Sequence, residues 1–368
     1  MLTDRLYRLQ SALTAAGLDG VAAIAGPNLV YLTGLGFHLS ERPSVGFFPA
    51  QGDPVFVVGQ LEASKFQGLP YPARVFTYTD TAGPAGAFAQ AAQALPRTLR
   101  RLAVEARRMR VMELRLIEEA FGLTSVEAAE PVWAGLRMTK DAAELAKMRV
   151  AVAIAERALL NTLPQIRAGL TEREVASELL VQTLRAGSDA ELPFAPIVAS
   201  GPNGALPHAT ITDRRLQAGD LLTVDWGAAK DGYVADLTRT YALGAAAPEL
   251  QRIYALVRDA NAAGRAAGRP GVTCASVDAA ARQVIAAGGY GEYFVHRVGH
   301  GLGLEGHEDP SMHGENQTLL AAGMTYTIEP GIYVPGLGGV RIEDDMVVTA
   351  AGAESLSTLP RDLHSLPV

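Results

Sequence analysis

The chain has 368 residues, of which 48% are hydrophobic and 19% are charged, values that argue against a disordered or fibrous protein. The net charge of -7 comes from interspersed acids and bases, so we expect no nucleic-acid partner. No apolar run approaches the roughly 18 residues of a membrane-spanning helix, so we expect no membrane partner. The lone Cys274 cannot form an internal disulfide, which favours the cytoplasm.

The length suits two domains. At the N-terminus, Leu2, Leu6, Leu9 and Leu13 recur at helical spacing and predict an amphipathic first helix. Short apolar runs then alternate with Gly and Pro turns over residues 21–80, followed by helical stretches near 83–95 and 111–120. This pattern predicts a small α/β domain over residues 1–132.

The second domain is expected over residues 133–368, where a long helix begins near Asp141. Thr171 and Glu174 form a capping box that announces another helix, because each side chain satisfies a free backbone N–H at the helix start. Further elements are expected as paired strands at 220–228 and 232–243, a helix at 248–267, and strands at 322–334 and 339–349.

An internal repeat divides this second domain. Residues 216–227 match residues 320–331 at Leu, Ala, Gly, Thr, Val/Ile, Asp/Glu and Gly, which places Asp225 on Glu329. Downstream, Asp236 has its counterpart in Glu343. The repeat predicts two similar halves, each a helix followed by a strand pair, with four carboxylates at a pseudo-two-fold centre.

Asp225 and Glu329 stand inside runs that are typical of buried strands, where an unpaired carboxylate is costly. If residues 229–232 form a four-residue loop, Asp225 lies directly opposite Asp236. A two-residue turn at residues 231 and 232 offsets them by two positions. In either case the two like charges come close enough to call for a cation between them. The competing interpretation is that the acids pair with Arg239 and Arg341 or face solvent.

Three of the seven histidines, His296, His300 and His307, stand close together in a glycine-rich segment ahead of both Glu329 and Glu343. Four carboxylates and one imidazole would suit two divalent cations. We expect manganese, with cobalt, zinc or iron as alternatives. Two such ions, about 3.5 to 4 Å apart, can share a bridging hydroxide as nucleophile.

Several motifs across about residues 141–350 resemble the pita-bread metallohydrolases, which include methionine aminopeptidases, Xaa-Pro aminopeptidases, Xaa-Pro dipeptidases (prolidases) and creatinases. They are Pro-His208, Val-Asp225-Trp-Gly, Ala-Asp236-Leu-Thr-Arg, the segment from Gly-His300 to His307-Glu, Thr-Ile-Glu329-Pro-Gly and Val-Arg341-Ile-Glu343-Asp.

The resemblance implies a smaller N-terminal creatinase-like α/β domain followed along the chain by a C-terminal pita-bread catalytic domain. It implies that Asp225 binds one metal, that Asp236 and Glu343 bridge both, and that His300 and Glu329 complete the other. Glu329 would also move the proton during hydrolysis of an Xaa-Pro bond by a bridging hydroxide.

By the same resemblance, His208 and His307 would stabilise the oxyanion and hold the substrate. His296 and Arg341 are similar to residues of the proline-specific members. The complete ligand set argues against the creatinases. The substrate implied is a small peptide with proline after the scissile bond.

One departure concerns peptide length. Some prolidases place an arginine, similar to a clamp for the dipeptide carboxylate, where this chain has Ser311. The function expected first is an Xaa-Pro dipeptidase. An Xaa-Pro aminopeptidase for longer peptides stays an alternative, and a metal-free peptide-binding pseudoenzyme is a remote one.

The first domain carries a Gly- and Pro-bounded loop at residues 34–43 with an aromatic, His38 and charged residues. Such loops are commonly solvated connectors. Related two-domain members are dimers in which this domain covers the partner's active site. We therefore expect a homodimer in which His38 or its neighbours approach the partner's metals and restrict substrate length.

Overall fold

The computed structural model describes residues 2–96 and 99–368, and the chain divides into two compact units, Met1–Arg137 and Met138–Val368. The boundary expected from the sequence, between residues 132 and 133, lies within helix α5 (Glu130–Arg137). Of the helices described, none is both long and apolar enough to cross a membrane.

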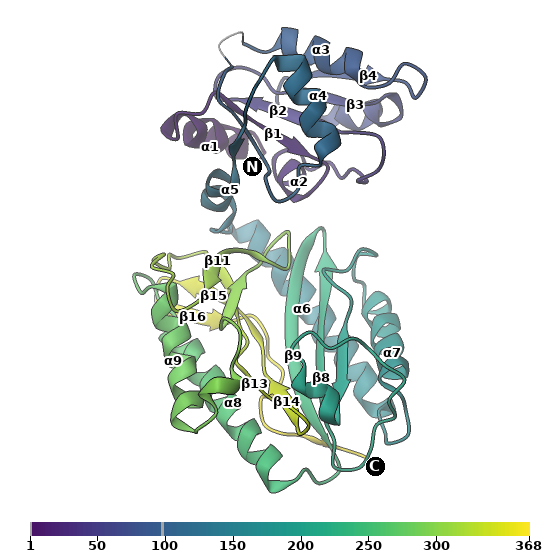
Figure 1. Cartoon of the computed structure of the whole chain (residues 1–368), viewed down its shortest axis with the longest axis vertical. Helices are drawn as coiled ribbons and strands as arrows, with labels where there is room; N and C mark the ends of the chain where they lie inside the picture. The colour runs from purple at the N-terminus through teal and green to yellow at the C-terminus, as the bar shows by residue number, and fades with distance from the viewer. Residues whose placement is uncertain (1, 97–98) are drawn as a thin grey trace. The chain divides into compact units, whose positions relative to one another are not determined.

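The first unit is a mixed six-stranded sheet of order β4-β3-β2-β1-β5-β6 with helices around it, the α/β domain that the sequence predicts (Figure 1). Its strands are β1 (Gly20–Ile24), β2 (Val45–Pro49), β3 (Val55–Gly59), β4 (Arg74–Tyr78), β5 (Leu102–Val104) and β6 (Glu127–Ala128). Its other helices are α1 (Leu2–Ala15), α2 (Pro27–Thr33), α3 (Ala85–Ala94), α4 (Val111–Phe121) and the 3₁₀ helix η1 (Gln60–Gly68). Helix α1 buries Leu6, Leu9 and Leu13, so the amphipathic prediction is confirmed.

The first half of the second unit packs two helices against a sheet of order β17-β9-β8-β7 (Figure 1). Its elements are α6 (Ala142–Thr162), η2 (Leu163–Gln165), α7 (Glu172–Arg185), β7 (Ile197–Ser200), η3 (Gly201–Ala205), β8 (Leu221–Lys230) and β9 (Tyr233–Leu243). The capping box of Thr171 and Glu174 is present at the start of α7. Trp226 is fully buried, and its indole N–H donates to the Ala155 carbonyl at 2.9 Å, which fixes β8 on α6.

The second half repeats this plan with the sheet β11-β10-β12-β15-β16. Its elements are α8 (Pro248–Ala267), α9 (Cys274–Ala287), η4 (Gly291–Tyr293), β10 (Gly299–Gly301), β11 (Glu308–Met312), β12 (Thr325–Ile328), the hairpin β13 (Gly331–Val334) and β14 (Gly338–Arg341), β15 (Asp344–Thr349) and β16 (Gly352–Ser355). Strand β17 (Ser365–Leu366) returns to pair with β9.

The repeat is visible in the backbone hydrogen bonds of the two halves. The Gly169 N–H donates to the Leu216 carbonyl at 2.8 Å, and the Gly271 N–H donates to the Leu320 carbonyl at the same distance. Gly219 and Gly323 have φ angles of 87° and 89°, in the left-handed region that glycine favours, and each stands in the turn two residues before the strand that leads to an acid. The sequence repeat therefore corresponds to two structurally similar halves.

Candidate metal centre

The hairpin of β8 and β9 sets the first two acids. Its turn is Asp231–Gly232, with φ angles of 49° and 80°, and positive φ at both central residues suits a two-residue hairpin turn. In the resulting register, Asp225 pairs with Thr238, and Gly227 pairs with Asp236. Of the two hairpins considered from the sequence, the structure therefore has the two-residue turn, with the acids offset by two positions.

The second pair of acids comes from the other half. Glu329 directly follows β12, and Glu343 lies between β14 and β15. An isolated bridge joins Glu343 to Thr238 of β9, with the Glu343 N–H donating to the Thr238 carbonyl at 3.0 Å. The Thr238 hydroxyl also donates to Glu343 Oε2 at 2.6 Å. These bonds hold Glu343 at the seam of the two halves, beside Asp236.

The five residues expected to bind metal lie together in this seam. Potential ligand atoms lie within 4.8 Å of one another in three overlapping groups: Asp225, Asp236 and Glu343; His300, Glu329 and Glu343; and Asp236, His300 and His307. His300 Nε2 lies 3.2 Å from Glu329 Oε1 and 3.7 Å from Asp236 Oδ2. Both halves therefore contribute donor atoms to one compact cluster.

Burial and mutual repulsion make the ionised form of this cluster unfavourable when no cation is bound. Burial raises the pKa of Asp225, and burial with the charge of Asp225 raises that of Asp236 well above its ordinary value. The pKa of Glu343 is also raised well above its ordinary value, by burial and by the charge of Asp236. Asp225 Oδ1 is buried and has no hydrogen-bond partner among the described residues. Divalent cations would relieve these costs, so the donor set fits a metal centre.

Glu329 differs from the other three acids. Burial alone would raise its pKa, but the hydrogen bond from His300 and the charges around it lower the pKa to about 2. Glu329 is therefore ionised at neutral pH. The His300 Nδ1 lies 3.2 Å from the Gly301 carbonyl, so a proton on Nδ1 in place of Nε2 would let Nε2 coordinate a cation instead of donating to Glu329.

Of the two arginines considered as partners of the acids, only one binds a carboxylate of the cluster. Arg341 is buried, and its Nη2 donates to Asp225 Oδ2 at 2.6 Å. Arg239 instead binds Asp344, with 2.8 Å between Nη2 and Oδ1. The competing interpretation therefore holds for the Arg341 pairing with Asp225, whose other oxygen faces the cluster.

His296 lies beside the cluster with both ring nitrogens engaged. Its Nδ1 is 2.7 Å from the Arg297 carbonyl and its Nε2 is 2.8 Å from the Tyr333 hydroxyl. Arg341 Nη1 donates to the same hydroxyl at 3.0 Å. Because a carbonyl only accepts, His296 donates from Nδ1 and accepts from Tyr333. Burial lowers the pKa of His296, which keeps the ring neutral.

His307 and His208 are more open to solvent than the buried ligands. The His307 ring centroid is 3.9 Å from that of His300. Burial and the positive charges of His300, Arg297 and His208 lower the pKa of His307 to about 4, so it is neutral at pH 7. A neutral imidazole at the open edge of the cluster can donate one hydrogen bond to a substrate.

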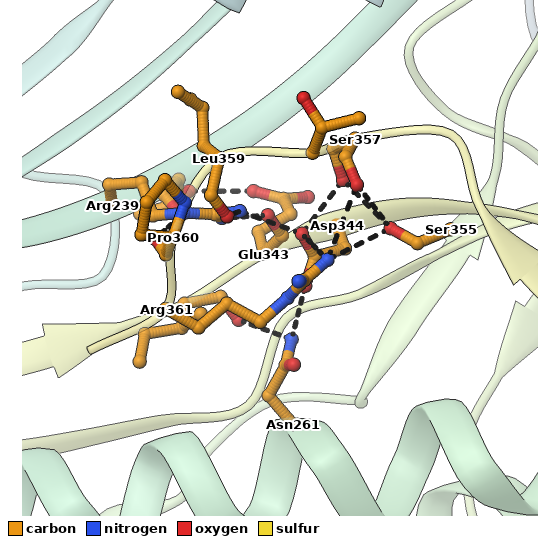
Figure 2. Close-up of polar contacts among 12 residues, drawn as sticks. Arg239, Asn261, Glu343, Asp344, Ser355, Ser357, Leu359, Pro360 and Arg361 are labelled. Carbon is orange, nitrogen blue, oxygen red and sulfur yellow. Dashed lines mark hydrogen bonds and ion pairs between the residues drawn. The ribbon is translucent and has the colours of Figure 1, made fainter.

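A buried polar network around Asp344 fixes the backbone of Glu343 (Figure 2). Asp344 accepts from Arg239, Arg361 and Ser357. Arg239 also donates to the Glu343 carbonyl at 2.6 Å. These charges lower the pKa of Asp344 to about 2 despite its burial, so its ionised carboxylate offsets part of the charge of the two guanidinium groups.

Asn261 of α8 connects this network to Glu329. Its Nδ2 donates to the carbonyls of Ile328 and Ile342, at 3.1 and 3.2 Å, which directly precede Glu329 and Glu343. Sequence reasoning missed Asn261, Tyr333 and Asp344 as site residues. Asp344 had a signal, because it follows Glu343 inside a recognised motif, whereas the other two stand in unremarkable helix and strand patterns.

The fold and the centre define a metal-dependent peptidase. Residues 146–350 match metallopeptidase family M24, and residues 5–139 match the creatinase/prolidase N-terminal domain. The chain therefore belongs to metallopeptidase family M24, which confirms the predicted pita-bread fold with its creatinase-like first domain.

Relatives cover nearly the whole chain. The crystal structure of dipeptidase PepE from Mycobacterium ulcerans is 38% identical, with a TM-score of 0.90, and the match covers 100% of this chain and 98% of the other. The Xaa-Pro dipeptidase from Bacillus anthracis is 31% identical, with a TM-score of 0.91 and full coverage of both chains. The putative dipeptidase YkvY of Bacillus subtilis is 34% identical over 98% of this chain and 99% of its own length.

The network around Asp344 predicts a large stability effect. Asp344→Ala removes the carboxylate from the buried Arg239 and the partly buried Arg361, so the free energy of unfolding should fall by about 3 to 5 kcal/mol. Urea denaturation monitored by circular dichroism measures the change. The matched control is Asp362→Ala, which removes an exposed ion pair with Arg258. Equal losses in the two variants would contradict the central role of Asp344.

Proposed function

We propose that this chain hydrolyses Xaa-Pro peptide bonds and acts chiefly as a dipeptidase. The observation that carries the proposal is the meeting of all five expected ligands in one buried cluster, with His296 and Arg341 at its edge. Relatives named dipeptidase and Xaa-Pro dipeptidase, aligned over nearly the full chain, support the same substrate class.

The cluster would hold two divalent metal ions, and manganese is the one we propose. Asp225 would bind one ion, Asp236 and Glu343 would bridge both, and His300 and Glu329 would complete the other. When bound, such ions supply a nucleophile from water at neutral pH and polarise the scissile carbonyl.

Glu329 would act as the proton carrier. Its carboxylate would accept a proton from the attacking water and deliver it to the proline nitrogen that leaves. Two of the other acids accept hydrogen bonds from fixed partners: Asp225 accepts from Arg341, and Glu343 accepts from the Thr238 hydroxyl. These fixed partners keep the acids oriented while the proton moves.

Three histidines would contact the substrate. His307, which is neutral at pH 7, and the exposed His208 would donate to the oxyanion and the peptide. His296 has both nitrogens engaged, so its ring offers a surface and no further donor. A flat, neutral ring next to Tyr333 suits the apolar ring of proline, and Arg341 holds Tyr333 in place.

We also propose a cytoplasmic homodimer in which the loop at residues 34–43 reaches the partner's active site. Cys274 is a buried free thiol, which suits a reducing compartment. His38 and Leu39 are exposed, and Leu39 keeps 45% of its surface accessible, so this loop offers side chains to a partner.

A substrate panel tests the activity. The protein reconstituted with manganese should cleave Ala-Pro, should cleave Ala-Ala much more slowly, and should lose activity when a chelator removes the metal. Release of proline measures the rates. Preference for Ala-Pro-Ala over Ala-Pro would favour the aminopeptidase alternative, and no cleavage of any Xaa-Pro peptide would refute the proposal.

Two variants separate metal binding from proton transfer. Asp236→Ala should lose metal at both positions, because this residue is proposed to bridge them. Glu329→Gln keeps an oxygen ligand but cannot accept the proton, so it should retain metal while turnover falls by roughly 100-fold or more. Elemental analysis and proline release measure the two effects. Two metals retained in Asp236→Ala, or near-normal turnover in Glu329→Gln, would contradict these roles.

A further inference from the structure

A positively charged side chain outside the expected ligand set lies next to β10, the strand that carries His300. Arg297 precedes β10, is partly exposed, and donates from Nη1 to the Ser311 hydroxyl at 2.9 Å. In the part of the chain that the structure describes, no carboxylate forms an ion pair with Arg297. Among the described residues, the Arg297 guanidinium therefore has a neutral hydrogen-bond partner and no opposite charge paired with it.

The position of Ser311 shows which way this charge faces. Ser311 pairs with His300 across β10 and β11, and directly opposite residues project their side chains on the same face of a sheet. His300 reaches Glu329 on that face. The Arg297 guanidinium, bonded to Ser311, therefore lies on the side of the metal centre.

Other cationic side chains near the centre already have anionic partners. Arg341 is paired with Asp225 at 2.6 Å, and its remaining nitrogens donate to Thr238, Pro207 and Tyr333. The pairs Arg282 with Asp278 and Lys140 with Glu308 are likewise formed. Among these groups, Arg297 is the one whose charge has no carboxylate partner in residues 2–96 and 99–368.

A guanidinium has five N–H donors in a planar fork that matches a carboxylate, and bidentate binding is stronger than bonds to neutral groups. Dipeptides that end in proline carry a free carboxylate next to the scissile bond. In a longer peptide this group is replaced by a neutral amide, which cannot balance the arginine charge.

We propose that Arg297 binds the free carboxylate of the residue after the scissile bond and so selects dipeptides. The inference rests on the proposed function, because it names the part of the substrate that the site recognises. Arg297 lies just before β10, and its guanidinium donates to Ser311, the position at which some prolidases have an arginine.

The test compares Ala-Pro with Ala-Pro-amide, which lacks the terminal charge. Arg297→Met in the full chain should lower kcat/KM for Ala-Pro by about 10- to 100-fold, the loss of a charge-assisted hydrogen-bonded pair, with little change for the amide. Arg297→Lys should restore part of the preference. Ser311→Ala should keep it, because the guanidinium remains. Arg149→Gln, an exposed arginine of α6 paired with Glu354, is the matched control.

A binding measurement keeps the inference separate from the activity. Calorimetry of the manganese-loaded protein should show tighter binding of L-proline than of L-prolinamide, and Arg297→Met should abolish the difference. This result would hold even if the parent protein cleaved no Xaa-Pro peptide, which would refute the proposed function alone. Equal losses for Ala-Pro and its amide would indicate a purely structural role and overturn the inference, as would an unchanged preference.

Discussion

The repulsion of four carboxylates buried at one seam is the constraint on which the centre depends. Two come from the β8–β9 hairpin and two from the other half of the repeat, so neither half can form the cluster alone. Burial raises the pKa of Asp225, Asp236 and Glu343, whereas His300 lowers that of Glu329. Such an arrangement is costly as long as the charges are unbalanced, and cations balance it.

Hydrogen bonds from neighbouring residues fix the two glutamates of this cluster in place despite the repulsion. The Thr238 hydroxyl fixes Glu343, and Asn261 fixes the carbonyls that precede both glutamates. The Asp344 network then ties the strand of Glu343 to Arg239 of β9 and to the C-terminal segment (Figure 2). Ligands held this rigidly lose little conformational freedom when a metal binds, so the stability of the network and the affinity of the centre are linked.

Much of this could be predicted from the sequence because the repeat carries it. The match of residues 216–227 to 320–331 predicted two halves that meet at four acids, and the structure has both. The local sequence left the offset of Asp225 and Asp236 open, because residues 229–232 are compatible with both a two-residue and a four-residue turn. The partners that lock the site were harder to predict, since Asn261 and Tyr333 act through contacts between residues distant in sequence.

The repeat also explains where specificity should be sought. Strand order β7-β8-β9-β17 in the first half corresponds to β10-β12-β15-β16 in the second, so β7 and β10 occupy equivalent places. The end of β7 has a structural role, because the Ser200 hydroxyl donates to the buried carboxylate of Glu172 at 2.8 Å. The segment around β10 instead carries His296, Arg297 and His300. The halves are therefore alike in the four acids of the metal centre, and they differ at β7 and β10, where the second half adds the ligand His300 together with His296 and Arg297. A residue that departs from the repeat beside β10, such as Arg297, is consequently a stronger candidate for recognising peptide length than any residue of the symmetric acid cluster.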